Sequence, residues 1–119
     1  GDSLDAFREF SKAYKTDSSY ADCAYQMGRA LLKQNRNKES RYYFRRAADL
    51  DELRFRASEE FNRIIKEISA QMGVPCVPMD SVFDAHSPHH IAGKELIFEH
   101  LHPNFEGYFL MAKAFSEQL

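Results

Sequence analysis

The chain reads Glu99-His100-Leu101-His102-Pro103-Asn104-Phe105-Glu106-Gly107-Tyr108 just before an apolar final segment. An acid stands three residues ahead of His102, and Pro103 and Asn104 lead into a helix that we expect over about 104–119. In a loop fixed at such a helix start, the Glu99 carboxylate can hold the His102 imidazole in the tautomer that a general base requires. The spacing therefore suits an acid–histidine pair formed by Glu99 and His102.

The composition of the chain limits what it can be. With 119 residues, 44% apolar and 29% charged, it is one compact unit or two small subdomains. A net charge of −2 gives no broad attraction to nucleic acid or to an anionic membrane, and no apolar run approaches the roughly 20 residues of a membrane span. Cys23 and Cys76 fit no metal or disulfide pattern, so we expect small buried hydrophobes and leave the cellular location open.

Residues 1–51 carry a helical pattern that repeats after 34 residues. The matching positions are Ala6, Phe10 and Ala13, then Ser40, Phe44 and Ala47. This period resembles the tetratricopeptide repeat, with Gly28 where a small residue lets the paired helix approach closely. The resemblance implies about one and a half repeats and a possible peptide or protein partner. Because about three repeats are needed to bury a continuous core, we favour a spacer packed on residues 52–119.

Residues 52–119 change in character. Ser58 is expected to cap an amphipathic helix that ends at Gly73, and residues 74–79 to form a short buried strand. The polar loop 86–99 carries most of the histidines. The apolar face of the first helix consists of Phe61, Ile64, Ile65, Ile68 and Met72, and the expected buried face of the last helix consists of Tyr108, Met111, Ala112, Phe115 and Leu119. Gly107 permits the close approach of a neighbouring backbone.

The order of helix, strand, loop and helix, closed by Glu99-His100-x-His102-Pro103-Asn104, resembles the end of a flavodoxin-like SGNH (GDSL-type) hydrolase. Three further motifs contribute to the resemblance: Leu53-Arg54-Phe55-Arg56-Ala57, Gly73-Val74-Pro75 and Ser87-Pro88-x-x-Ile91-x-Gly93-x-Glu95-Leu96. Together they look like a bacterial arrangement in which tetratricopeptide repeats are inserted ahead of the last strand of the hydrolase domain. Two positions depart from the pattern, because Glu99 replaces an aspartate and Pro78 stands where related strands often carry an acid.

The resemblance implies a mainly α chain, an α/β fragment in which tetratricopeptide-like hairpins (1–51) pack on the C-terminal piece (52–119) of the hydrolase domain. His102 would be the general base and Glu99 its orienting acid in an ester hydrolase without a cofactor. The chain opens inside a helical pattern and lacks the family's serine nucleophile and oxyanion hole, so we expect a fragment that is inactive alone. Its partner would be the rest of the domain, and an exposed sheet edge could form a homodimer.

Gly1-Asp2-Ser3-Leu4 spells the nucleophile motif of the same hydrolases. In that family the serine follows a buried strand, and no residue here precedes Gly1 to form one. We therefore interpret Asp2 or Ser3 as the N-cap of the helix that follows.

Two other functions remain open. The chain could be an interaction or scaffold module in which the acid–histidine pair is vestigial. All five histidines also lie between residues 86 and 102, which makes His100, His89 and His90 candidate metal ligands. No ordered ligand spacing such as His-Glu-x-x-His is present, so we predict no metal site.

Overall fold

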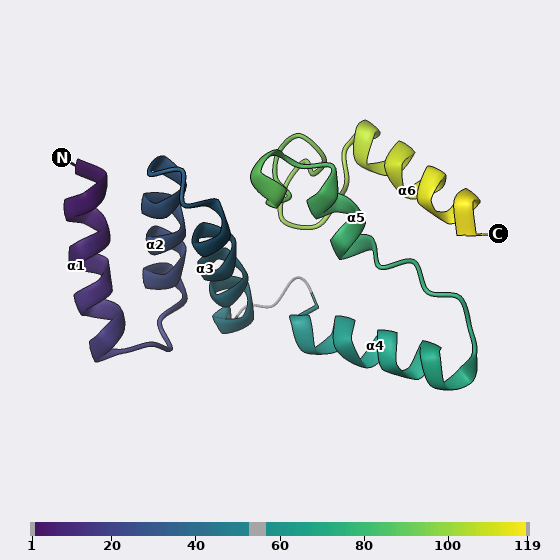
Figure 1. Cartoon of the computed structure of the whole chain (residues 1–119), viewed down its shortest axis with the longest axis horizontal. Helices are drawn as coiled ribbons and strands as arrows, with labels where there is room; N and C mark the ends of the chain where they lie inside the picture. Colours follow the sequence, from purple (N-terminus) through teal and green to yellow (C-terminus); the bar gives the residue numbers. More distant parts are fainter. Residues whose placement is uncertain (1, 53–56, 119) are drawn as a thin grey trace. The chain divides into compact units, whose positions relative to one another are not determined.

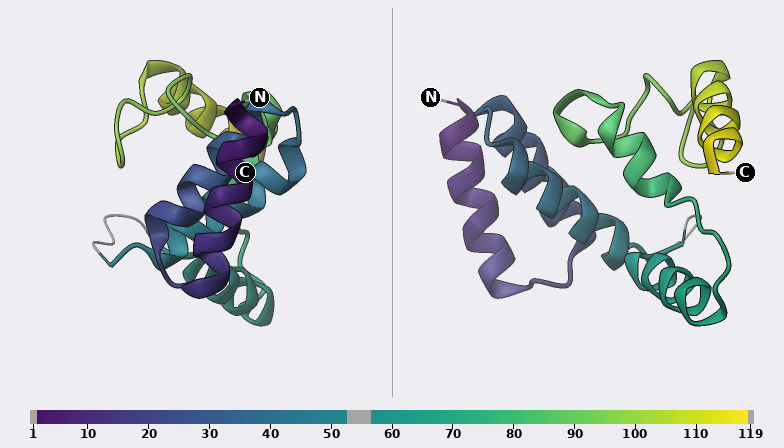
Figure 2. Two further views of the ribbon diagram at one scale, coloured as in Figure 1. Left: turned by 90° about the vertical axis from the view of Figure 1, so that its left-hand side faces the viewer. Right: turned by 45° about the vertical axis from the view of Figure 1, so that its right-hand side comes forward.

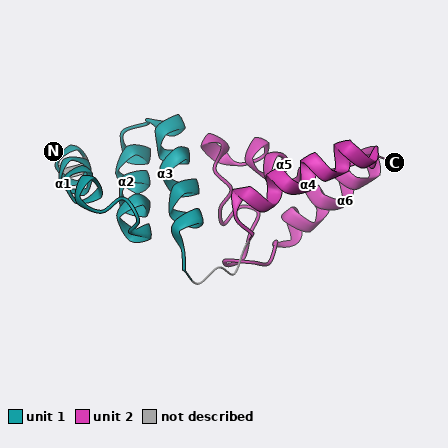
Figure 3. Ribbon diagram, turned by 90° about the horizontal axis from the view of Figure 1, so that it is seen from below, with its two compact units in different colours: residues 1–54 teal, residues 55–119 magenta. Residues whose placement is uncertain are grey.

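The computed structural model describes residues 2–52 and 57–118. The chain divides into two compact units, unit 1 (Gly1–Arg54) and unit 2 (Phe55–Leu119), which Figure 3 shows in different colours. Within the described ranges the regular structure is helical, and no strand is formed. The prediction of a mainly α chain is confirmed. No helix in the described ranges is long and apolar enough to cross a membrane.

Unit 1 is a row of three helices, α1 (Asp2–Thr16), α2 (Ala21–Lys33) and α3 (Asn37–Leu50). They lie side by side with α2 in the middle, packed against both neighbours (Figure 1 and Figure 2). The central helix is the most buried because it has a neighbour on each side. Its buried residues are Cys23, Ala24, Met27, Gly28, Ala30 and Leu31. The thiol of Cys23 donates a hydrogen bond to the Phe10 carbonyl (3.2 Å). Cys23 is buried as predicted, whereas Cys76 is only half-buried.

The contact between α2 and α3 depends on two small residues. A Cβ atom added to Gly28 would lie 2.9 Å from Cδ1 of the Phe44 ring, so glycine allows that ring to lie against the α2 backbone. Ser40 is fully buried, and its hydroxyl donates a hydrogen bond to the Gly28 carbonyl (2.8 Å). The predicted close approach at Gly28 is confirmed.

Unit 2 begins with α4 (Glu59–Met72), which ends where the sequence predicts. Gly73 has a φ of 65°, in the left-handed region that glycine adopts without cost. The N–H groups of Gly73 and Val74 donate to the Ala70 and Ser69 carbonyls, the two bonds of a Schellman motif. Ser58 stands at the N-cap position with an extended backbone, but its side chain makes no capping hydrogen bond.

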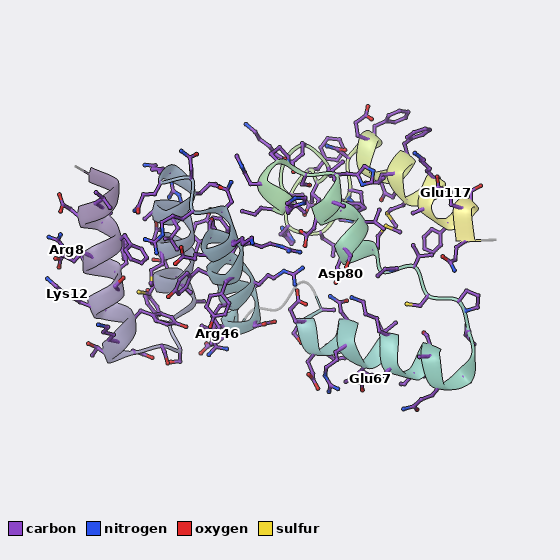
Figure 4. All side chains as sticks on the ribbon, in the orientation of Figure 1. Arg8, Lys12, Arg46, Glu67, Asp80 and Glu117 are labelled. Atoms are coloured by element: carbon purple, nitrogen blue, oxygen red, sulfur yellow. The ribbon has the colours of Figure 1, made fainter. Side chains whose placement is uncertain are left out.

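The predicted strand over 74–79 does not form. Residues 74–78 have no regular structure, and Met79 already belongs to α5 (Met79–Ala85). A strand needs a partner for its backbone groups, none of the described residues supplies one, and Pro75 and Pro78 have no N–H to offer. Without a strand there is no sheet edge in the described ranges, so the basis for the expected homodimer is absent. Lys66 of α4 forms an ion pair with Asp80 (3.1 Å). Asp80 lies in the first turn of α5 (Figure 4).

The core of unit 2 is small and lies between α5 and α6 (Phe105–Gln118). Its three buried residues are Phe83, Leu96 and Leu110. Around them pack Met79, Val82, Ala92, Ile97 and Met111. The short η1 turn (Pro88–His90) follows α5 and leads into the segment that contributes Leu96.

The two long helices of unit 2 expose apolar faces. Every member of the α4 stripe is exposed, and Met72 reaches 71%. On α6 the prediction of a buried face is wrong for Tyr108, Ala112 and Phe115, which are exposed, while Met111 is half-buried and Leu119 lies outside the described residues. The buried positions are Gly107 and Leu110, because the packing of α6 on Leu96 and Phe83 fixes which side of it turns inward.

Candidate active-site loop

Residues 98–102 form a closed loop at the start of α6. Ile97 and Pro103 pair as an isolated antiparallel bridge. The N–H of Phe98 donates to the His102 carbonyl (2.9 Å) and that of Asn104 to the Leu96 carbonyl (2.9 Å). These bonds bring the two ends of the loop together and present the residues between them at the surface.

Asn104 ties the base of the loop to α6. Its Oδ1 accepts a hydrogen bond from the N–H of Gly107 (2.9 Å), which caps the helix. Its Nδ2 donates to the carbonyls of Lys94 (3.2 Å) and Glu95 (3.0 Å). The sequence predicts the helix start at this residue. The two hydrogen bonds to the carbonyls of residues 94 and 95 join parts of the chain that are nine and ten residues apart, and no local sequence pattern predicts this contact.

Gly107 is the point of closest approach between α6 and the loop. A Cβ atom at this position would lie 2.2 Å from the carbonyl oxygen of Leu96 and 2.9 Å from Cβ of Pro103. The prediction that a neighbouring backbone approaches Gly107 is confirmed. Only glycine fits, because the nearest atom belongs to the main chain and cannot turn aside.

The structure brings Glu99 and His102 into direct contact. Nδ1 of His102 is hydrogen-bonded to Oε1 of Glu99. An ionised carboxylate only accepts hydrogen bonds, so Nδ1 is the donor and Nε2 is left as the acceptor of the neutral ring. This is the tautomer that a general base needs. Both side chains are exposed, with 64% of His102 and 41% of Glu99 accessible.

Backbone groups also hold the Glu99 carboxylate. Its Oε2 accepts from the N–H of Leu101 (2.7 Å) and its Oε1 from the N–H of His102 (3.3 Å). The hydrogen bond from the His102 ring is the largest cause that lowers the pKa of Glu99 below its ordinary value, and the two backbone donors lower this pKa further. Because the lowered pKa favours the charged form, Glu99 remains a carboxylate at neutral pH.

The lowered pKa of Glu99 predicts how the loop responds to acid. The bonds of Glu99 stabilise the loop at every pH above the ordinary glutamate pKa, and they are lost as the pH falls through the lowered value. In an NMR titration we expect the Leu101 and His102 amide signals to move together, with a midpoint below that of an ordinary glutamate. Glu99→Gln should abolish this step. A wild-type midpoint at or above the ordinary value would contradict the prediction.

The other histidines lie outside this loop, except His100, whose Nδ1 is 3.2 Å from Oε2 of Glu99. Nδ1 of His86 is hydrogen-bonded to the Val82 carbonyl (2.9 Å). His89 and His90 are exposed on the η1 turn, both with φ near 60°. Over the described ranges, no group of three or more His, Cys, Asp or Glu side chains could hold a metal ion. Sequence reasoning missed the contact of His100 with Glu99, although the adjacent positions of the two residues could have indicated it.

Comparison of the chain with protein-family models, with curated proteins and with solved structures finds no match in any of the three.

Proposed function

We propose that Glu99 and His102 form the acid–base part of a serine ester hydrolase of the SGNH type, within a longer protein whose other segments carry the serine and the oxyanion hole. The observation that carries the proposal is the hydrogen bond from Nδ1 of His102 to Glu99, which leaves Nε2 as a proton acceptor. The lowered pKa of Glu99 adds support, because the acid partner must remain charged while the ring gains a proton.

The proposed reaction begins when Nε2 of His102 takes the proton of the serine hydroxyl as its oxygen attacks the ester carbonyl. The new C–O bond moves the carbonyl electron pair onto the carbonyl oxygen, and Glu99 stabilises the imidazolium. When the electron pair returns, the bond to the leaving alkoxide breaks and the imidazolium gives it the proton. Water then attacks the acyl-enzyme and gives a proton to His102, the bond between the acyl carbon and the serine oxygen breaks to release the carboxylic acid, and the imidazolium returns its proton to that serine oxygen.

The exposed apolar faces of α4 and α6 support a larger hydrolase domain around this loop. In α/β domains helices cover both faces of a parallel sheet and bury one side of themselves against it. The stripe on α4 and the aromatic residues of α6, Phe105 (81% exposed) and Phe109 (66%), have the character of such sheet-facing surfaces. The strands of that domain, which other segments of the longer protein would supply, are the proposed partner of unit 2.

The packing of unit 1 supports a short tetratricopeptide-like array. Two neighbouring helices of such a repeat approach closely where one carries a small residue, and Gly28 against Phe44 meets that requirement. With α1 as the second helix of a preceding repeat, α2 and α3 complete one full repeat. We assign this array the role of a spacer beside the hydrolase domain.

The test is hydrolysis of a short-chain nitrophenyl ester by the longest natural form of the protein that contains these residues. His102→Ala is expected to lower kcat by about a hundredfold, the usual effect of removing a general base. His90→Asn is the matched control, because it changes an exposed histidine outside the loop and asparagine accepts the left-handed backbone. Turnover that survives in His102→Ala, or a wild type without turnover, would refute the proposal.

A further inference from the structure

The Glu99 carboxylate contacts two imidazoles. Oε1 accepts hydrogen bonds from the backbone N–H of His102 and from Nδ1 of its ring. Oε2 accepts a hydrogen bond from the N–H of Leu101 and lies 3.2 Å from Nδ1 of His100. An ionised carboxylate offers about four acceptor positions. Both oxygens therefore accept a backbone N–H, and Oε2 also lies 3.2 Å from the His100 ring nitrogen, so the carboxylate cannot rotate without breaking a backbone hydrogen bond at each oxygen.

We infer that His100 is a positioning residue, which holds Oε2 of Glu99 so that Oε1 stays directed at Nδ1 of His102. The effect of His100 on catalysis rests on the proposed function, whereas its positioning role rests only on the contacts of Glu99. His100 acts through the carboxylate, and no contact of its ring with His102 is required. Because a carboxylate turns about its single C–C bond, a donor on the second oxygen fixes the direction of the first.

The first readout is the tautomer of His102, measured in the chain itself by two-bond proton–nitrogen NMR correlations of the imidazole. The spectra are recorded at about pH 8 so that the two tautomers of the neutral imidazole can be compared. We expect the form protonated on Nδ1 to dominate in the wild type. His100→Ala should raise the ratio of the other tautomer by about two- to tenfold, the effect of one hydrogen bond.

His100→Asn distinguishes positioning from general damage to the loop. The amide nitrogen of asparagine occupies nearly the place of Nδ1 and is a donor, so this variant should restore the wild-type tautomer ratio. His90→Asn again serves as the control that should change nothing. The inference is overturned if His100→Ala leaves the His102 tautomer ratio unchanged, or if asparagine at position 100 fails to restore it.

The second readout separates this inference from the proposed function. In the longest natural form of the protein, His100→Ala should lower kcat for the nitrophenyl ester by about two- to tenfold with KM unchanged, since only the orientation of the base is affected. A tautomer shift in a protein without ester turnover would refute the hydrolase proposal and support the positioning role. Full turnover with an unchanged tautomer ratio would refute the positioning role alone.

Discussion

Gly107→Ala is expected to destabilise unit 2 by about 3 kcal/mol, at the upper end of the usual cost of overpacking. The added methyl group would lie 2.2 Å from the Leu96 carbonyl oxygen, well inside contact distance. That oxygen accepts the N–H of Asn104, so moving it away breaks the bond that closes the loop. A shift of α6 would instead separate Leu110 from Phe83 and Leu96. Either adjustment therefore removes an interaction that stabilises unit 2.

Urea unfolding followed by NMR signals of α6 would measure this loss. Lys113→Ala on the same helix is the control, because Lys113 is exposed and its ion pair with Glu117 spans 3.9 Å, a contact that contributes little. A Gly107→Ala variant whose unfolding midpoint lies within the range of the Lys113→Ala variant would show that α6 does not pack on the loop as described.

Leu31→Ala is expected to lower the stability of unit 1 by about 3 kcal/mol, within the range measured for such truncations. Leu31 is fully buried in the middle helix, where α1 and α3 pack on opposite sides. The structure around a truncated side chain relaxes only in part, so a cavity cost adds to the lost burial.

Leu4→Ala is the matched control for unit 1, since it removes the same atoms from a side chain that is 58% exposed. Hydrogen exchange of the α2 amides under native conditions would report the difference. We expect strongly reduced protection in Leu31→Ala and nearly wild-type protection in Leu4→Ala. Equal effects of the two substitutions would contradict the complete burial of Leu31 in unit 1.

Local rules predict the parts of the fold that depend on neighbours in sequence. The end of α4 at Gly73 follows from the left-handed backbone that glycine permits. The contact at Gly28 follows from side-chain size, and the pairing of Glu99 with His102 follows from a three-residue separation in a short loop. Each of these features needs only a few residues close together in the chain.

The features that sequence reasoning missed depend on partners far away in the chain. An apolar pattern at 74–79 is compatible with a strand, but a strand forms only beside another strand, and Pro75 and Pro78 weaken it further. The sequence predicts the wrong buried side of α6 because large aromatic residues such as Tyr108 and Phe115 can pack in a core as Leu110 does, and only the position of Gly107 against Leu96 decides which side turns inward. The bonds of Asn104 to residues 94 and 95 were missed for the same reason.

The closure of the loop by its own neighbours has a consequence for the order of folding. The hydrogen bond with the largest separation in sequence joins Asn104 to Lys94, ten residues apart, and the bond from Phe98 to His102 joins residues four apart. Contacts of such short range cost little chain entropy and form early, well before pairings between distant segments. Because the His102 ring is held by Glu99 within this short stretch, the proposed hydrolase would have its base oriented before a serine from a distant segment is brought to it.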